Sequence, residues 1–591
     1  MSFTAGMAAL GRNDLGAAEQ KAFARAIEHL GESLPSRPET MSLPKLVLAG
    51  SGADRLWQGP KKLATKDCAA VAAGVQWRPI EGRDSALEVL CEEFFKPEPR
   101  PPGVFDCFSG ALFNKRDHTL VLTTDPLGLS PVYYHIRNGT LVFSSHQLFI
   151  RAFLGQDIRP DFPSVLEYLI IGHQIGNRSL LKGVQTLPPG VFLTCANGAT
   201  ALNRYQVDVG RGSSCTGLSP SQAAGVLSDY LVSKRENYER LSNTPIAGFL
   251  SGGWDSRYLL ALFADAGRVA RTFTTQQRLR RRDFYISEEA IAGDVAAHLR
   301  LPNQFVPPTY RDASNMLQRA EVLDFSTWFH DWAFHMADTV PKGQYLLADG
   351  LLGDLLLRGL FLDDSLADLM THGERGGALD VLHGLLVGGF NTYTRGAGSW
   401  ERILVKSVIK KFEEALREDV RQELRDIEHD DFISLFLLRN RSRRGIAPLS
   451  RLVFGRVGDV HLPFCDPGFV HLALTLPLAA RRDGSVYREL LERARPGLSS
   501  IPSTNERDLG RLRPYLVKGL PPETLAGRSA RKAGKIEAIM TGPPETFMPI
   551  LRPEIRRAFQ ERDAATIGRH LLFLEKIYLL EGFFRPKKLS T

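Results

Sequence analysis

Cysteine is scarce in this chain of 591 residues, and no two cysteines have the spacing of a metal site. The six are Cys68, Cys91, Cys107, Cys195, Cys215 and Cys465. Their scatter predicts no zinc centre and is typical of a protein from a reducing compartment. The sequence also lacks an apolar run of the ~18 residues that a membrane helix needs, and its first residues lack the pattern of a secretory signal. We therefore expect a cytoplasmic protein with no membrane insertion.

Positive charge is spread along the chain, although the formal net charge is +8. The two tightest basic clusters are 278–282 and 439–444, and neither is interleaved with aromatic residues. Such clusters can steer an acidic substrate, but charge runs usually indicate a solvated surface. We predict no nucleic-acid binding. The content of 43% hydrophobic and 24% charged residues is that of a globular protein, and the length predicts more than one domain.

The most informative segment is 248–256, with the sequence GFLSGGWDS. An apolar run over 246–250 predicts a strand, and apolar residues at helical spacing after the segment predict a helix. Gly252 and Gly253 allow a close approach of the backbone, so their amides can face phosphate oxygens at the start of the helix. No lysine follows the glycines, which excludes the GxxxxGK[ST] loop.

Asp255 lies within this loop and would repel bare phosphate, so its carboxylate indicates a bridging Mg²⁺. The loop resembles the SGGxDS pyrophosphate loop of the N-type ATP pyrophosphatases, which release pyrophosphate from ATP. The resemblance implies nucleotide contacts from Leu250, Ser251, Gly252, Gly253, Asp255 and Ser256. An ordinary glycine turn before a buried helix is the alternative interpretation.

Four other segments occur in a characteristic order: 124–134 (TDPLGLSPVYY), 141–145 (LVFSS), 187–190 (LPPG) and 204–205 (RY). Together with SGGWDS they resemble the asparagine synthetase family. The resemblance implies two domains: an Ntn-hydrolase-like αββα sandwich of the class-II glutamine amidotransferase type over 1–210, and an N-type ATP pyrophosphatase (PP-loop) domain over 215–591. The residues agree, because short strands with turns fill 100–205, while helices alternate with apolar strands after 215, which predicts an α/β parallel sheet.

The amidotransferase-like domain is expected to be degenerate. In the family a cysteine nucleophile follows the initiator methionine, whereas this chain has Ser2 there and Phe3 in place of a glycine. The glutamine-binding segments RGPD and FNGEIYN are missing between residues 20 and 100. A serine hydroxyl needs stronger activation than a thiol, so we predict no glutamine hydrolysis, and whether Ser2 has any activity stays open.

A second loop, 345–354 (YLLADGLLGD), resembles the GEGADE loop of the family. The match implies that Asp354 holds Mg²⁺ together with Asp255 across the pyrophosphate; a helix cap is the alternative role of Asp354. The strand expected over 269–274 matches the strand that contacts adenine. Further nucleotide contacts are therefore expected from Phe273, Thr274, Gly350 and Gly353.

Several positions depart from the family pattern. Leu351 and Leu355 replace the two glutamates of GEGADE, so a base for the attacking nitrogen must come from elsewhere. Asp349 is the candidate base, although it can equally be a turn residue. Arg488 lies near the lysine of a TKxxLR-like segment, where a cation would meet developing negative charge; a surface salt bridge is the alternative. The unmatched segment 360–400 is a candidate acceptor pocket.

The resemblance implies an ATP- and Mg²⁺-dependent, AMP-forming carbon–nitrogen ligase. It would adenylate a carboxylate, after which an amine displaces AMP. The function we favour is a peptide macrolactam (lasso-type) cyclase, whose partners would be a precursor peptide and its leader-processing peptidase. Two alternatives are an asparagine synthetase-like enzyme that amidates a small or saccharide-linked acid with ammonia, and a non-catalytic scaffold.

Overall fold

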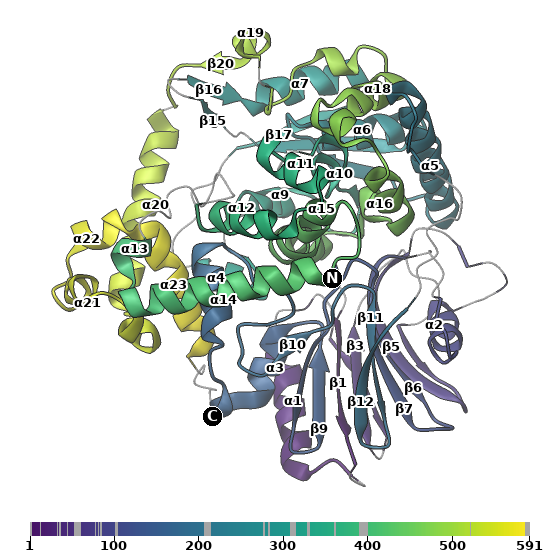
Figure 1. The fold of residues 1–591 in the computed structure, drawn as a ribbon, viewed down its shortest axis with the longest axis vertical. Coiled ribbons are helices and arrows are strands. Elements are labelled where there is room, and N and C mark those ends of the chain that lie inside the picture. Colours follow the sequence, from purple (N-terminus) through teal and green to yellow (C-terminus); the bar gives the residue numbers. More distant parts are fainter. Residues whose placement is uncertain are drawn as a thin grey trace.

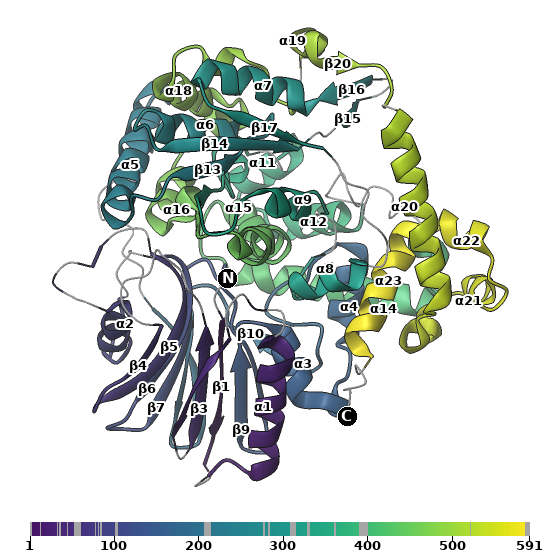
Figure 2. The ribbon, with the colours of Figure 1, turned by 180° about the vertical axis from the view of Figure 1, so that it is seen from behind.

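The computed structural model describes residues 3–11, 14–31, 34, 37–43, 45–51, 61–76, 79–80, 82, 85–100, 105–205, 214–275, 278–281, 284–307, 315–327, 331–359, 362–388, 400–506, 508–520 and 522–585. Ser2 and the side chains of the basic cluster 278–282 lie outside this description. The chain forms a β-sandwich from its N-terminal third and, above it, a parallel sheet among many helices (Figures 1 and 2).

The N-terminal part consists of two antiparallel sheets that pack face to face. Their strand orders are β10-β8-β9-β1-β3-β2 and β12-β11-β7-β6-β5-β4. The strands are β1 (Phe3–Ala9), β2 (Glu39–Leu43), β3 (Leu46–Ser51), β4 (Lys62–Ala64), β5 (Cys68–Gln76), β6 (Phe105–Asn114), β7 (Thr119–Thr124), β8 (Tyr133–Arg137), β9 (Thr140–Ser144), β10 (Gln185–Thr186), β11 (Val191–Ala196) and β12 (Ala199–Arg204).

Apolar side chains from alternate strand positions fill the space between the two sheets, among them Leu48, Val71, Leu122 and Phe143. Helices cover the outer faces: α1 (Ala17–Gly31) and α3 (Gln147–Leu154) lie on the first sheet and α2 (Ala86–Phe94) on the second. A fourth helix, α4 (Phe162–Ile170), leads towards the C-terminal part. These layers form the αββα arrangement that we expected.

The C-terminal part is built on a five-stranded parallel sheet with the order β17-β14-β13-β18-β19. Its strands are β13 (Ile246–Phe249), β14 (Val269–Thr275), β17 (Asn303–Val306), β18 (Leu346–Ala348) and β19 (Val460–His461). The first strand, β13, is central, and the chain proceeds to β14 on one side and later to β18 on the other. The ends of β13 and β18 therefore form a topological switch point, where α/β sheets bind their ligands.

Helices surround this sheet and extend beyond it (Figure 2). They are α5 (Pro220–Leu241), α6 (Trp254–Ala264), α7 (Glu288–Leu299), α8 (Met316–Val322), α9 (Asp331–Thr339), α10 (Gly353–Arg358), α11 (Asp364–Thr371), α12 (Arg375–Gly388), α13 (Trp400–Ile403), α14 (Lys406–Arg425), α15 (Phe432–Leu437), α16 (Pro467–Leu474), α17 (Leu478–Arg482), α18 (Ser485–Ala494), α19 (Leu509–Leu512), α20 (Pro522–Thr541), α21 (Pro553–Gln560), α22 (Ala564–Arg569) and α23 (Leu571–Phe584). A small antiparallel sheet joins β15 (Arg278–Arg281), β16 (Phe284–Ser287) and β20 (Leu516–Val517).

The basic cluster 439–444 connects the two parts of the molecule, so our prediction of a solvated surface there is wrong. The cluster lies in a π-helical segment, Leu438–Ile446, and Arg443 and Arg444 are buried. Arg443 donates to the carbonyl oxygens of Gly128 at 3.1 Å and Leu187 at 2.7 Å. These guanidinium groups leave water because the carbonyls of the sandwich replace their hydration.

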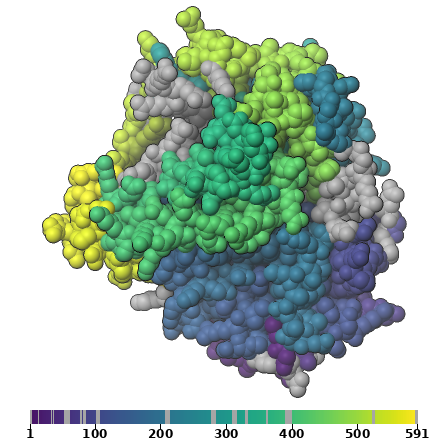
Figure 3. Space-filling model, viewed as in Figure 1, coloured from purple at the N-terminus to yellow at the C-terminus, as the bar shows by residue number. Residues whose placement is uncertain are grey.

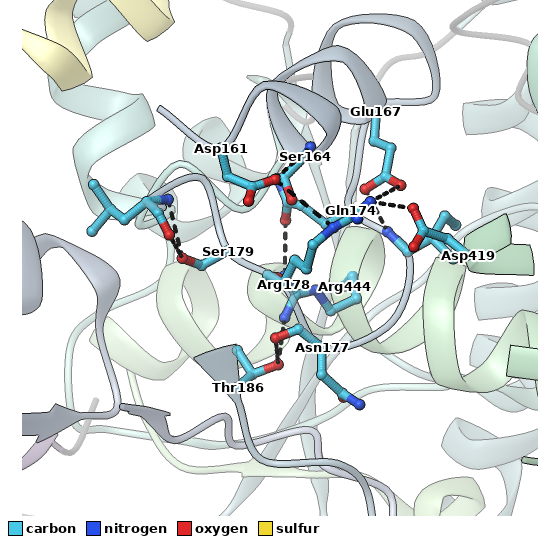
Figure 4. A network of polar contacts seen from close by, with 12 residues as sticks. Asp161, Ser164, Glu167, Gln174, Asn177, Arg178, Ser179, Thr186, Asp419 and Arg444 are labelled. Carbon is cyan, nitrogen blue, oxygen red and sulfur yellow. Dashed lines mark hydrogen bonds and ion pairs between the residues drawn. The ribbon is translucent and has the colours of Figure 1, made fainter. Parts of the chain in front are cut away.

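A polar network continues this interface (Figure 4). Arg178 forms ion pairs with Glu167 of α4 and with Asp419 of α14. Arg444 donates to the hydroxyl of Thr186 and to the backbone carbonyl of Arg178. The space-filling view shows the sandwich in direct contact with the C-terminal part along this face (Figure 3). The two parts are therefore joined by specific polar contacts.

The C-terminal segment packs against both parts of the chain. Helix α23 is buried along most of its length and contacts α4, α8 and α20. The ammonium group of its buried residue Lys576 donates to the backbone carbonyl of Leu169 in α4. Among the described residues, no helix is long and apolar enough to span a bilayer.

Candidate nucleotide and metal site

Two loops meet at the topological switch point. The loop after β13 places Asp255 in the first turn of α6, and the loop after β18 places Asp354 in the first turn of α10. The backbone N–H of Asp354 donates to Oδ2 of Asp255 at 2.9 Å. The two predicted metal ligands therefore come together, although they are 99 positions apart in the sequence.

Glycine makes this approach of the two loops possible. A Cβ built on Gly350 would lie 2.6 Å from Cβ of Asp255, and one on Gly353 would lie 2.6 Å from its Cγ. Carbon atoms in contact are normally about 3.5–4.0 Å apart. Both glycines were expected to contact the nucleotide; the structure shows that they make room for Asp255.

The loop after β13 is held by its own side chains. The backbone N–H groups of Ser251 and Gly253 donate to the hydroxyls of Ser256 and Ser251, each at 3.1 Å. The N–H of Gly252 donates to Oε1 of Glu288 at 3.1 Å. Burial raises the pKa of Glu288 to about 7. We did not predict a role for Glu288 from the sequence, although it lies in the first turn of a helix, α7, that follows a strand.

A cavity of about 400 Å³ opens between the two loops, α9 and the segment 441–454. Its walls are formed by Phe249, Leu250, Ser251, Asp255, Ser256, Thr275, Glu288, Trp332, Met336, Ala348, Asp349, Gly350, Leu351, Leu352, Asp354, Leu355, Arg441, Ser442, Ile446, Leu449, Ser450 and Phe454. Seven of the predicted site residues line this cavity: Leu250, Ser251, Asp255, Ser256, Asp349, Gly350 and Asp354. None of the described residues from the candidate acceptor segment 360–400 lines this cavity.

The strand expected to contact adenine, β14, lies beside the cavity, but it contributes a different residue to the cavity wall than we expected. Phe273 is buried in the core, and its carbonyl accepts the N–H of Leu250 at 2.9 Å. The hydroxyl of Thr274 donates to the carbonyl of Leu250, also at 2.9 Å. Neither side chain lines the cavity, whereas that of Thr275 does. Phe273 and Thr274 thus hold Leu250, at the start of the loop, in place through hydrogen bonds.

The structure does not bring Arg488 to the cavity. Arg488 is exposed on α18, while its neighbour Tyr487 is fully buried and donates to Oδ1 of Asp255 at 2.7 Å. The sequence contained two signals for this arrangement. Counting the TKxxLR pattern back from Leu490 places Tyr487 at the lysine position, and the buried face of α18 includes Tyr487 but excludes Arg488. A neutral phenol therefore stands where we expected a cation.

Asp349 lies on the cavity wall and has two partners. Its Oδ1 accepts the N–H of Leu351 at 3.1 Å, and its Oδ2 accepts the hydroxyl of Ser450. Desolvation raises the pKa of Asp349, while the Ser450 bond opposes that rise. The turn role that we considered is thus present, and a base role remains a prediction.

The electrostatics of the site favour a bound cation. Desolvation and the nearby Asp354 carboxylate raise the pKa of Asp255 well above its usual value, although Tyr487 opposes the shift. Desolvation also raises the pKa of Asp354, which Arg358 contacts at 3.4 Å. Two carboxylates forced together away from water favour a cation between them. Within the described part of the chain, no group of three or more His, Cys, Asp or Glu side chains is placed to hold a metal. Mg²⁺ fits such a site when phosphate and water complete its coordination.

Comparison with known proteins supports a relationship with glutamine-dependent amide-forming enzymes. Residues 103–206 match the model of the glutamine amidotransferase domain family. Over 230 residues the chain is 25% identical to asparagine synthetase [glutamine-hydrolyzing] 1 of Bacillus subtilis (strain 168). The match covers 37% of this chain and 34% of that protein, so the chain spans about a third of the length of this relative. The asparagine synthetase family is the group that these similarities support.

Two solved structures are similar over more than half of the chain. One is glutamine phosphoribosylpyrophosphate amidotransferase from B. subtilis complexed with ADP and GMP, at 9% identity over 59% of this chain and 75% of that chain. The other is the allosteric regulatory enzyme of purine biosynthesis, at 10% identity over 54% and 77%. Both have a TM-score of 0.22, which is too low to support a structural argument.

Proposed function

We propose that this chain is an ATP-dependent ligase that adenylates a substrate carboxylate, releases pyrophosphate and lets an amine displace AMP to form an amide. The observation that carries this proposal is the meeting of Asp255 and Asp354 over the ends of β13 and β18, beside a cavity large enough for a ligand. The similarity to an asparagine synthetase supports it.

Each residue has a definite role in this proposal. Asp255 and Asp354 hold Mg²⁺, which neutralises the phosphates and the leaving pyrophosphate when it is bound. The amides of Gly252 and Gly253 donate to phosphate oxygens in place of their present side-chain acceptors. Tyr487 fixes the orientation of the Asp255 carboxylate through its hydrogen bond.

The proposed nitrogen source is an amine or free ammonia, because Ser2 stands where a glutaminase of this family has its cysteine. We favour an intramolecular amide, as in a peptide macrolactam cyclase of the lasso type. Its partners would be a precursor peptide and a leader-processing peptidase. The similarity to an asparagine synthetase favours a second candidate, the amidation of a small acid. In this proposal ammonia supplies the nitrogen, and a saccharide-linked acid is an alternative substrate.

A non-catalytic scaffold is the third candidate. The observation in its favour is that Tyr487 replaces a cation and that Leu351 and Leu355 replace two glutamates. Under this proposal the cavity still binds a nucleotide but does not activate an acid.

ATP–pyrophosphate exchange against a panel of acids and peptides tests the reaction. Asp255→Ala and Asp354→Ala should abolish exchange, because Mg²⁺ loses its only two protein ligands in this proposal. Asp368→Ala, which removes an exposed carboxylate on α11, serves as the matched control and should leave exchange unchanged. Ser2→Ala should preserve amide formation. Exchange that persists in both site variants, or ADP as the nucleotide product, would contradict the proposed reaction.

A further inference from the structure

The cavity has two chemically different ends. The end formed by Ser251, Asp255 and Asp354 is polar and faces the N-termini of α6 and α10. Apolar side chains from four separate elements form another part of the wall, which we call the apolar end: Phe249, Trp332, Met336, Ile446 and Phe454. A ligand that fills the whole cavity therefore needs a charged end and an apolar end.

The apolar end is built around an aromatic cluster. The ring of Phe454 is buried and lies 4.1 Å from the ring of Phe249 and 6.0 Å from that of Trp332, measured between centroids. Phe249, Trp332 and Ile446 are only half-buried, although they line the cavity. Their remaining apolar surface thus faces the space where a ligand would lie.

Cations are sparse on the cavity wall, and the five side chains of the apolar end carry no charge. Among the described lining residues, Arg441 is the one cation, and it lies close enough to Asp354 to lower the pKa of that carboxyl. Asp349 is already bonded to Ser450 and to the N–H of Leu351. A second carboxylate on the substrate would therefore lose its water at the apolar end without gaining a partner.

We propose that the apolar end binds the side chain of the acid to be activated, and that this side chain is aromatic or branched aliphatic. The inference rests on the proposed ligase function and adds the class of substrate to it. The substrate carboxylate then points towards the phosphate loop, where Arg441 meets its charge. The adenine ring is the competing occupant, but its polar edge needs both donors and acceptors, and the side chains of the apolar end offer the indole N–H of Trp332 and no nitrogen or oxygen acceptor.

Matched acids test this assignment. We would measure ATP–pyrophosphate exchange with 3-phenylpropanoate, 4-methylpentanoate, butanoate and succinate, which share a linear acid frame and differ in the distal group. We expect kcat/KM for the phenyl and branched acids to exceed that for succinate by about 100-fold or more, because the site leaves a second charge unpaired. Equal or faster exchange with succinate would overturn the assignment.

Variants separate the substrate side chain from adenine. Trp332→Ala should raise KM for 3-phenylpropanoate by about 10-fold and leave KM for ATP unchanged, while Trp332→Phe should restore most of the loss. Phe305→Ala, at an exposed ring on β17 outside the cavity, is the control. A rise in KM for ATP alone would place adenine at this end and refute the proposal.

A binding measurement distinguishes the two levels of the proposal. Calorimetric titration of the whole protein with 3-phenylpropanoate and with succinate reports binding whether or not exchange occurs. One outcome is that the phenyl acid binds and Trp332→Ala weakens this binding, while no acid or peptide supports exchange. This outcome would refute the ligase function but support the assignment of the pocket. No binding of the phenyl acid and no preference over succinate would refute the pocket assignment itself.

Discussion

Replacing Gly350 by alanine tests whether the close approach of the two loops builds the site. The added Cβ would lie 2.6, 3.1 and 3.3 Å from Cβ, the carbonyl carbon and Cα of Asp255. None of these atoms can rotate away, and carbons in contact need about 3.5–4.0 Å. The loops must therefore separate by about 1 Å. The backbone of Gly350 is not in the left-handed region, so the clash alone causes the effect.

The expected magnitude follows from this displacement. Overpacking of this size costs about 1–3 kcal/mol of stability, and moving a reacting group by about 1 Å lowers a rate by about 100-fold. Urea unfolding and ATP–pyrophosphate exchange measure the two effects. The control is Gly384→Ala in α12, where nothing lies within 4 Å of the new Cβ and a gain of about 0.5–1 kcal/mol is expected. A Gly350→Ala protein with wild-type unfolding and exchange would refute the steric argument.

Two further predictions concern buried charge. Because burial raises the pKa of Glu288 from 4.5 to about 7, the folded protein holds a proton that the unfolded chain has lost, and stability falls as pH rises between these values. In urea unfolding measured between pH 4.5 and about 7, the decline in the free energy of unfolding should be smaller by about 3 kcal/mol for Glu288→Gln than for the wild type. An unchanged dependence of this free energy on pH would show that the carboxyl is solvated. Arg443→Met leaves the carbonyls of Gly128 and Leu187 without their donor, so unfolding should become easier by about 2–4 kcal/mol, whereas exposed Arg425→Met should change it by less than about 0.5 kcal/mol.

The strand, loop and helix around residues 248–256 were predictable because their determinants are local. An apolar run, two glycines and apolar residues at helical spacing specify a strand, a tight turn and a helix; β13 agrees with the predicted strand to one residue, and α6 follows the turn as predicted. The pairing of Asp255 with Asp354 is not local. It was inferred because two segments resembled loops of one family, and the parallel order of β13 and β18 is what places them together.

The contacts that sequence reasoning missed depend on distant parts of the chain. Arg443 is buried because carbonyls from the sandwich surround its guanidinium group, and no feature near residue 443 reveals those carbonyls. Arg488 differs, since the apolar spacing of Val486, Leu490 and Leu491 already places it off the buried face of α18. The helical period of α18 therefore indicates that Tyr487 faces the core, whereas the motif match led us to its neighbour Arg488.

The two carboxylates of the site have unequal partners, and this inequality shapes how a cation would bind. Asp354 is contacted by Arg358, whose guanidinium lies 4.3 Å from the centre of the Trp254 ring, and Arg441 also lowers its pKa. Among the described residues, the hydrogen-bond donors to Asp255 are neutral, namely the phenol of Tyr487 and the N–H of Asp354, and Arg358 lowers its pKa without contacting it. Since a charge in a partly desolvated site is stabilised mainly by opposite charge, Asp255 gains more from Mg²⁺ than Asp354 does. With a neutral phenol beside Asp255, the charge balance of the loop after β13 would therefore depend more strongly on a bound cation.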